Sequence, residues 1–205
     1  MQIRKLLVPA CVLGAAALAQ PAQAQTILPL SFEARGGVVL PQGDLNDGAS
    51  TGFTVGGAVH YRIAPMVSLY GGYDYSRFSV DDDSDFGNVD ANLTDSGFRV
   101  GARFDVPLGA LTGVSPFVEG GATFNQTSVN LSDSGGGSSV GVDSDRNLGY
   151  EVGAGLSFNV APKISLTPGV RYRSHTADFG DDGEGGDNKF DANYFSIDLG
   201  VHIRL

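Results

Sequence analysis

Apolar and polar residues alternate with a period of two along much of this chain. The alternation is strictest at residues 195–205, where every second side chain is apolar. Successive side chains of a β-strand point to opposite faces, so this pattern predicts a strand with one apolar and one polar face. The same alternation returns at residues 53–63, 98–106 and 150–160. These segments are also rich in β-branched and aromatic residues, which favour strands, and the chain is therefore predicted to be all-β.

Eight strands are predicted when the alternation is followed outward from these segments. Their expected bounds are residues 31–41, 52–64, 66–79, 96–107, 115–129, 147–160, 163–177 and 192–205. Long connections rich in Asp, Gly and Ser, at 42–51, 80–95, 130–146 and 178–191, alternate with short ones that contain proline. Proline suits turns because it cannot donate to a strand ladder. This order of elements predicts an eight-stranded antiparallel up-and-down β-barrel.

A short repeat marks the start of three predicted strands. The segments are Gly52-Phe53-Thr54-Val55-Gly56, Gly97-Phe98-Arg99-Val100-Gly101 and Gly149-Tyr150-Glu151-Val152-Gly153. Each segment begins one strand of a predicted hairpin, so the repeating unit is a hairpin. Four hairpins that close into a barrel place both chain termini at the same end.

Residues 1–24 have the pattern of a cleaved export signal. A basic start is followed by an apolar stretch from Leu6 to Leu18 and by the small residues Ala22-Gln23-Ala24, which suit a cleavage site. The apolar stretch is shorter than the ~20 residues that a membrane-spanning helix needs. We therefore expect residues 25–205 to form a single barrel domain after cleavage.

The single cysteine, Cys11, lies inside the predicted signal. The alternative interpretation, a lipoprotein attachment site, is disfavoured because Pro9 precedes the cysteine and the apolar stretch continues past it. The domain would then contain no cysteine, which excludes disulfides and thiolate metal sites.

The predicted domain is strongly acidic. The chain has a formal net charge of −10, and loss of Arg4 and Lys5 with the signal lowers this charge to −12. A domain of this charge repels phosphates, so no nucleic-acid partner is expected.

The polar faces of the predicted strands nevertheless carry charges of both signs. Seven arginines, six acidic residues and two histidines fall on these faces: Glu33, Arg35, His60, Arg62, Asp74, Arg99, Arg103, Asp105, Glu119, Glu151, Arg171, Arg173, Asp198, His202 and Arg204. Lysine is rare after the signal, where only Lys163 and Lys189 occur. Arginines balanced by acids fit a narrow lumen, in which buried ions must be paired.

We therefore predict that the polar faces line the inside of the barrel and that the apolar faces contact lipid. The expected charge network of the lumen consists of Glu33, Arg35, Arg62, Arg99, Arg103, Glu119, Glu151, Arg171 and Asp198. The alternative is a soluble, lipocalin-like barrel whose solvent face is rich in arginine.

Strand length and aromatic residues favour the membrane barrel. A tilted transmembrane strand needs roughly 9 to 11 residues, and the predicted strands reach this length. Aromatic side chains near the predicted strand ends are typical of girdles at the two membrane interfaces. Among them are Tyr61, Tyr73, Tyr150, Tyr172 and Tyr194, whereas tryptophan is absent from the chain.

The chain resembles the small OmpA/OmpX-type outer-membrane β-barrel family over its whole length after the signal. The cleavage site at Ala22-Gln23-Ala24, the Gly-aromatic-x-Val-Gly hairpins and the terminal strand ending Val201-His202-Ile203-Arg204-Leu205 carry the resemblance. The resemblance implies an outer-membrane location and a single barrel domain that lacks the peptidoglycan-binding domain of longer members. It also implies a monomer in contact with outer-membrane lipids and lipopolysaccharide.

The same resemblance implies that the last strand is read by the barrel-assembly machinery. The residues that would carry this role are Phe195, Ile197, Leu199, Val201, Ile203 and Leu205. Family members usually end in phenylalanine, so Leu205 departs from the pattern, while the alternation is kept.

One segment is a candidate for catalysis. Residues 171–176, ending in Ser174-His175-Thr176, vaguely resemble the His-x-Ser segment of the outer-membrane lipid A deacylases. The position two residues after His175 is Ala177, so the nucleophile is missing. Ser174 cannot replace it, because adjacent strand residues face opposite sides. We expect neither an enzyme nor a bound cofactor.

Two acidic segments are candidates for calcium binding. Residues 81–85 place aspartates at the first, third and fifth positions of a calcium loop. Phe86 then stands where glycine is needed, and Asn92 where a bidentate glutamate would lie. Residues 181–187 are similar to a Gly/Asp calcium repeat that occurs only once. We interpret both as solvated loops and expect no dedicated metal site.

Three functional classes are compatible with these features. A structural or surface-interaction protein would act through its acidic loops, and a narrow channel or small-solute transporter would act through its lumen. A soluble periplasmic binding barrel would need apolar residues inside. Eight strands enclose an interior just wide enough for side chains, so a charged and largely plugged lumen favours the first class.

Overall fold

The computed structural model describes residues 29–47, 49–79, 89–106, 108, 113–133, 139–178 and 189–205. The predicted signal, residues 1–24, lies outside this part of the chain and stays a prediction. The same holds for the two segments compared with calcium loops, residues 81–85 and 181–187.

The described chain is almost entirely β-strand. The elements are β1 (Leu30–Gln42), η2 (Gly43–Asp47), β2 (Ser50–Ala64), β3 (Val67–Ser79), β4 (Val89–Asp105), β5 (Val114–Asp133), β6 (Ser139–Asp143), β7 (Asn147–Ala161), β8 (Ile164–Asp178) and β9 (Lys189–Arg204). η2 is a short 3-10 helix. Among the described residues, no helix has the length and hydropathy needed to cross a membrane.

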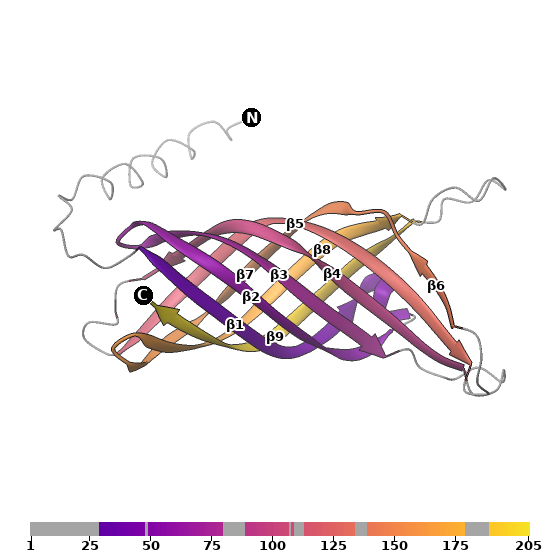
Figure 1. Cartoon of the computed structure of the whole chain (residues 1–205), viewed down its shortest axis with the longest axis horizontal. Coiled ribbons are helices and arrows are strands. Elements are labelled where there is room, and N and C mark those ends of the chain that lie inside the picture. Colours follow the sequence, from indigo (N-terminus) through magenta and orange to yellow (C-terminus); the bar gives the residue numbers. More distant parts are fainter. Residues whose placement is uncertain are drawn as a thin grey trace, which may run out of the picture.

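Eight of these strands close into an antiparallel barrel (Figure 1). The order around the sheet is β4-β3-β2-β1-β9-β8-β7-β5, and pairing of β4 with β5 completes the ring. Ser31 of β1 pairs with Arg204 of β9, so the first and last strands meet at the end with the short turns. The predicted eight-stranded up-and-down barrel is therefore confirmed.

The hairpin of β4 and β5 extends farther than the alternation predicted. Its ladder runs out to the pair Val89 and Asp133, and β6 pairs along the end of β5 (Figure 1). The expectation that residues 80–95 and 130–146 are only connections is therefore wrong in part. Strand pairing needs backbone hydrogen bonds alone, so a ladder that continues beyond the apolar zone keeps no alternating pattern.

Large apolar side chains cover the outside of the barrel. Val55 is 49% exposed, Val118 53% and Leu199 52%, although these strands are regular and paired on both edges. In β8 the outward apolar row runs from Ile164 to Tyr172, a span of nine residues, and Ser174 begins a polar zone. This length matches the roughly 9 to 11 residues of a tilted transmembrane strand.

The interior has the opposite character. Arg99, Arg171, Glu151, Asp74 and Asp198 are each at most 4% exposed. A soluble barrel would place its apolar residues inside and its charges outside. The soluble lipocalin-like alternative is therefore excluded, and the apolar band is the surface that meets lipid.

Candidate functional site

The barrel lumen is the candidate site, and its turn-side half centres on Arg171 of β8. The Arg171 guanidinium is hydrogen-bonded to Glu119 of β5 and Asp198 of β9, and its Nη2 lies 3.3 Å from Glu33 Oε1 of β1. Glu33 Oε2 also lies 2.9 Å from His60 Nε2. One arginine thus joins three carboxylates from three other strands across the lumen.

A second layer has the opposite arrangement, with each carboxylate surrounded by arginines. Asp74 of β3 lies 2.6 Å from Arg35, 3.1 Å from Arg99 and 2.6 Å from Arg173. Glu151 of β7 lies 3.2 Å from Arg99 and 2.7 Å from Arg173. Two carboxylates therefore hold three guanidiniums, and each buried ion lies beside at least one ion of opposite charge, as burial requires.

The two layers form one connected network. Arg35 Nη1 lies 3.7 Å from Glu119 Oε1, which also contacts Arg171. Tyr70 of β3 donates a hydrogen bond of 3.1 Å to Glu151 from across the lumen. With His60 of β2, which contacts Glu33, the network draws on all eight barrel strands, and this breadth makes it a cross-brace of the closed sheet.

Glycines of the repeated hairpin segments, together with Gly121 of β5, provide the space for these side chains. A Cβ atom at Gly101 would lie 2.5 Å from the Tyr70 hydroxyl oxygen, and one at Gly121 would lie 2.8 Å from it. A Cβ atom at Gly153 would lie 2.7 Å from Cγ of Arg171. The inward glycines are therefore required because the long charged and aromatic side chains lie flat over them.

Seven of the nine predicted network residues lie together in this network. They are Glu33, Arg35, Arg99, Glu119, Glu151, Arg171 and Asp198. Arg103 is buried nearer the turns, where it pairs with Asp105 at 2.9 Å and stacks on the Phe117 ring at 3.7 Å. Arg62 is exposed at the turn end of β2, next to a register shift, and does not join the network.

Two residues at the centre of the network were left out of the predicted set. Asp74 and Arg173 stood on the polar face of the sequence pattern, and their alternation alone could have placed them inside. Tyr194, expected in an interfacial girdle, is instead 3% exposed inside the barrel. Its hydroxyl donates to Asp95 at 2.7 Å and accepts from Arg173 at 3.1 Å.

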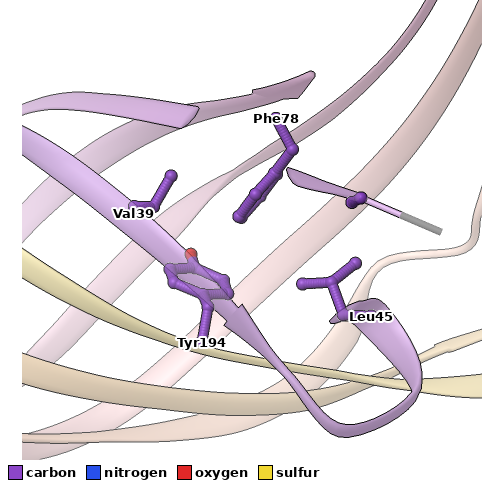
Figure 2. Packing of buried hydrophobic residues seen from close by; sticks show 5 residues of the cluster. Val39, Leu45, Phe78 and Tyr194 are labelled. Atoms are coloured by element: carbon purple, nitrogen blue, oxygen red, sulfur yellow. The ribbon is translucent and has the colours of Figure 1, made fainter. Parts of the chain in front are cut away.

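An apolar cap closes the loop-side end of the lumen. Leu45 of η2 packs with Val39, Phe78 and Tyr194, and each of these side chains is at most 3% exposed (Figure 2). The rings of Phe78 and Tyr194 meet edge to face at 5.3 Å. Gly43, the first residue of η2, has a φ of +58°, a conformation that glycine adopts without strain.

Histidines occupy both ends of the interior. Toward the turns, the His60 and His202 rings lie 4.9 Å apart, and His202 Nε2 lies 2.6 Å from Ser31 Oγ. Toward the loops, His175 Nε2 lies 3.2 Å from Thr127 Oγ1 and 3.4 Å from Asp95 Oδ1. Both His175 partners meet the same ring nitrogen, so no base-and-orienter relay of the hydrolase type is formed there.

The described residues contain no group of three or more metal-ligating side chains placed to hold an ion. Ser174, the neighbour of His175, alternates to the opposite face of β8, as predicted. The geometry of the lumen is therefore that of a packed, ion-paired interior.

The sequence matches the family described as outer membrane protein beta-barrel domain over residues 10–202. The chain belongs to this family. It is an outer-membrane protein, in agreement with the apolar band on its outer face. No curated protein sequence matches the chain.

Solved structures support the same fold. Neisserial surface protein A shares 22% identity at a TM-score of 0.61, covering 88% of this chain and all of that one. A major outer membrane protein of Thermus thermophilus shares 15% identity at a TM-score of 0.56, covering 86% and 99%. OprG of Pseudomonas aeruginosa shares 16% identity at a TM-score of 0.51, covering 85% and 96%. These likenesses concern the fold alone.

Proposed function

We propose that this barrel is a non-conducting outer-membrane protein with a structural or surface-interaction role. The observation that carries the proposal is the filled lumen. The ion-paired network crosses the middle, the cap of Leu45 covers the loop side, and Arg103 stacked on Phe117 fills the turn side.

An ion crossing this lumen would have to replace several buried pairs at once. Asp74 alone is in contact with three guanidiniums, at 2.6 to 3.1 Å. Breaking one buried pair costs roughly 3 to 5 kcal/mol. A steady current through the native arrangement would require this cost at each layer, so a packed brace suits the side chains better than a pathway.

The remaining surface then carries the function. We propose that the long acidic loops face the outside of the cell and the short turns face the periplasm, as in outer-membrane barrels generally. In this arrangement the loops are the interaction surface, and the barrel is a monomer in outer-membrane lipid and lipopolysaccharide. Catalysis is not part of the proposal, since the His175 cluster lacks a nucleophile relay.

The outward face of the last strand suits recognition by a partner protein while the barrel is being assembled. Its outward row consists of Phe195, Ile197, Leu199, Val201 and Ile203 and ends at Leu205, with β9 pairing to β1 to close the barrel. We propose that this row is the feature that the barrel-assembly machinery recognises before closure.

Planar-bilayer recording tests the closed lumen. Wild-type protein should pass no steady current, whereas the pair Asp74→Ala and Arg173→Ala, which empties the centre of the network, should produce resolvable openings. Asp191→Asn, an exposed change outside the network, is the matched control. A large steady current through the wild type would contradict the proposal and favour the narrow channel or small-solute transporter.

A further inference from the structure

The lipid-facing surface is hollowed on one side of the barrel. A depression of about 500 Å³ lies over β1 to β4, where Gly57 and Gly71 form its floor and Phe32, Tyr73 and Phe98 stand around it. A smaller one of about 230 Å³ lies over β3 to β5, above Ala102 and Gly120. Both lie among outward apolar residues, at the depth of the hydrocarbon core.

A cationic group stands at the loop-side margin of the larger hollow. The Arg146 guanidinium lies 5.9 Å from the centre of the Phe98 ring, and this ring also lines the hollow. Attraction between a guanidinium and an aromatic face holds such a side chain at the membrane interface. The positive charge and the apolar hollow are therefore parts of one surface.

A second arginine lies on the same side of the barrel. Arg77 follows Tyr73 by four residues along the outward row of β3, and its Nε donates 3.2 Å to Asn92. Arg77 and Arg146 are both exposed, and neither forms an ion pair with another described side chain. Two such guanidiniums above an apolar hollow suit an amphiphile with phosphate groups and acyl chains.

We propose that this face binds lipid A, with its phosphates at Arg146 and Arg77 and an acyl chain lying over Gly57 and Gly71. The inference rests on the proposed orientation, because external loops place these arginines in the outer leaflet. Guanidiniums form charge-assisted hydrogen bonds with phosphate oxygens. Absence of side chains at the glycines lets the acyl chain approach the backbone between Tyr73 and Phe98.

Binding is measured with purified, delipidated protein in uncharged detergent micelles. The probes are bisphosphorylated lipid A, the same lipid without phosphates, and inorganic phosphate. EDTA is included because Asp143 and Asp145 are exposed beside Arg146 and could hold a bridging cation. Wild type should bind bisphosphorylated lipid A at least tenfold more tightly than the dephosphorylated form, and inorganic phosphate only weakly.

Two sets of variants separate the headgroup from the hollow. The double change Arg77→Gln and Arg146→Gln should remove the preference for the phosphorylated lipid, whereas Arg62→Gln, an exposed arginine at the turn side, should keep it. Gly71→Leu should weaken both lipids, and a Cβ there meets nothing within 4 Å, so the barrel should fold. Val170→Leu, on the opposite strand β8, is its control.

The lipid site would be overturned if the wild type bound the two lipids equally, or if the double arginine variant kept the preference for the phosphorylated lipid. It would also be overturned if Gly71→Leu changed the oligomeric state and left lipid binding intact. The last result would assign the hollow to a second copy of the chain. The titration is independent of conductance. A conducting barrel that still selects the phosphorylated lipid would refute the proposed function and retain the site.

Discussion

Replacement of Arg171 by glutamine should destabilise the barrel severely. The Arg171 side chain is 2% exposed and contacts Glu33, Glu119 and Asp198, whose side chains are fully buried. The amide of glutamine has two N–H donors against the five of a guanidinium and supplies no charge. Three carboxylates would then face the lumen, and Arg35, 3.7 Å from Glu119, would be the guanidinium left beside them.

The magnitude follows from the charges that are left without partners. Removing one member of a buried pair costs roughly 3 to 5 kcal/mol, and Arg171→Gln should fall in this range. Adding Glu119→Gln removes one of the stranded carboxylates, so the double variant should regain about 1 to 2 kcal/mol of the loss. The coupling energy should lie between roughly 0.5 and 3 kcal/mol, as is usual for residues in contact.

Urea unfolding in detergent micelles measures these free energies of unfolding. The chain contains no tryptophan, so the transition is followed by far-UV circular dichroism and by the mobility of unheated samples on gels. Asp191→Asn, an exposed carboxylate that accepts a 3.0 Å hydrogen bond from Thr176, is the control and should change stability by less than about 0.5 kcal/mol. Loss of less than about 1 kcal/mol in Arg171→Gln, or strictly additive costs in the double variant, would refute the cross-brace.

Three further predictions concern the outer face, the cap and the orientation. Leu199→Arg puts a charge into the middle of the lipid-facing row of β9 and should cost roughly 2 to 4 kcal/mol in bilayers; a cost near zero would contradict lipid contact there. Leu45→Ala should cost about 2 kcal/mol, the low end for a buried leucine because η2 can detach, and should speed proteolysis near η2, while the exposed Asn46→Ala should not. A cysteine at Ser138 should react with a membrane-impermeant maleimide in intact cells and one at Lys163 should not, with the reverse pattern indicating inverted topology.

The sequence by itself determined the strands and their two faces. A period-two pattern needs only the geometry of a single strand, so it could be read from local order in the chain. The choice of inside and outside also came from the sequence, because arginines balanced by acids are costly unless a closed lumen pairs them. Arg99, Glu119 and Arg171, which the alternation places on the polar face, are buried in the structure.

Partners across the lumen were decided only by the tertiary structure. Glu33 and Arg171 are 138 residues apart, and Arg171 and Glu119 are 52 apart. Closure through β4 and β5 and the tilt of the strands decide which strands face each other across the lumen. Neither property can be predicted from the local sequence pattern. Arg62 illustrates the same limit. The alternation places it on the polar face, but it lies at the rim of the barrel, where its side chain is exposed.

The elements at the loop side of the barrel could likewise not be predicted from the sequence pattern. η2 and β6 fall in segments whose polar composition predicts connections, and Asp95 was counted with them. Leu45 becomes a cap only because β1, β3 and β9 bring Val39, Phe78 and Tyr194 beneath it. A single apolar residue in a polar loop has no period to reveal it, and its burial depends on a surface that exists only after the barrel has closed.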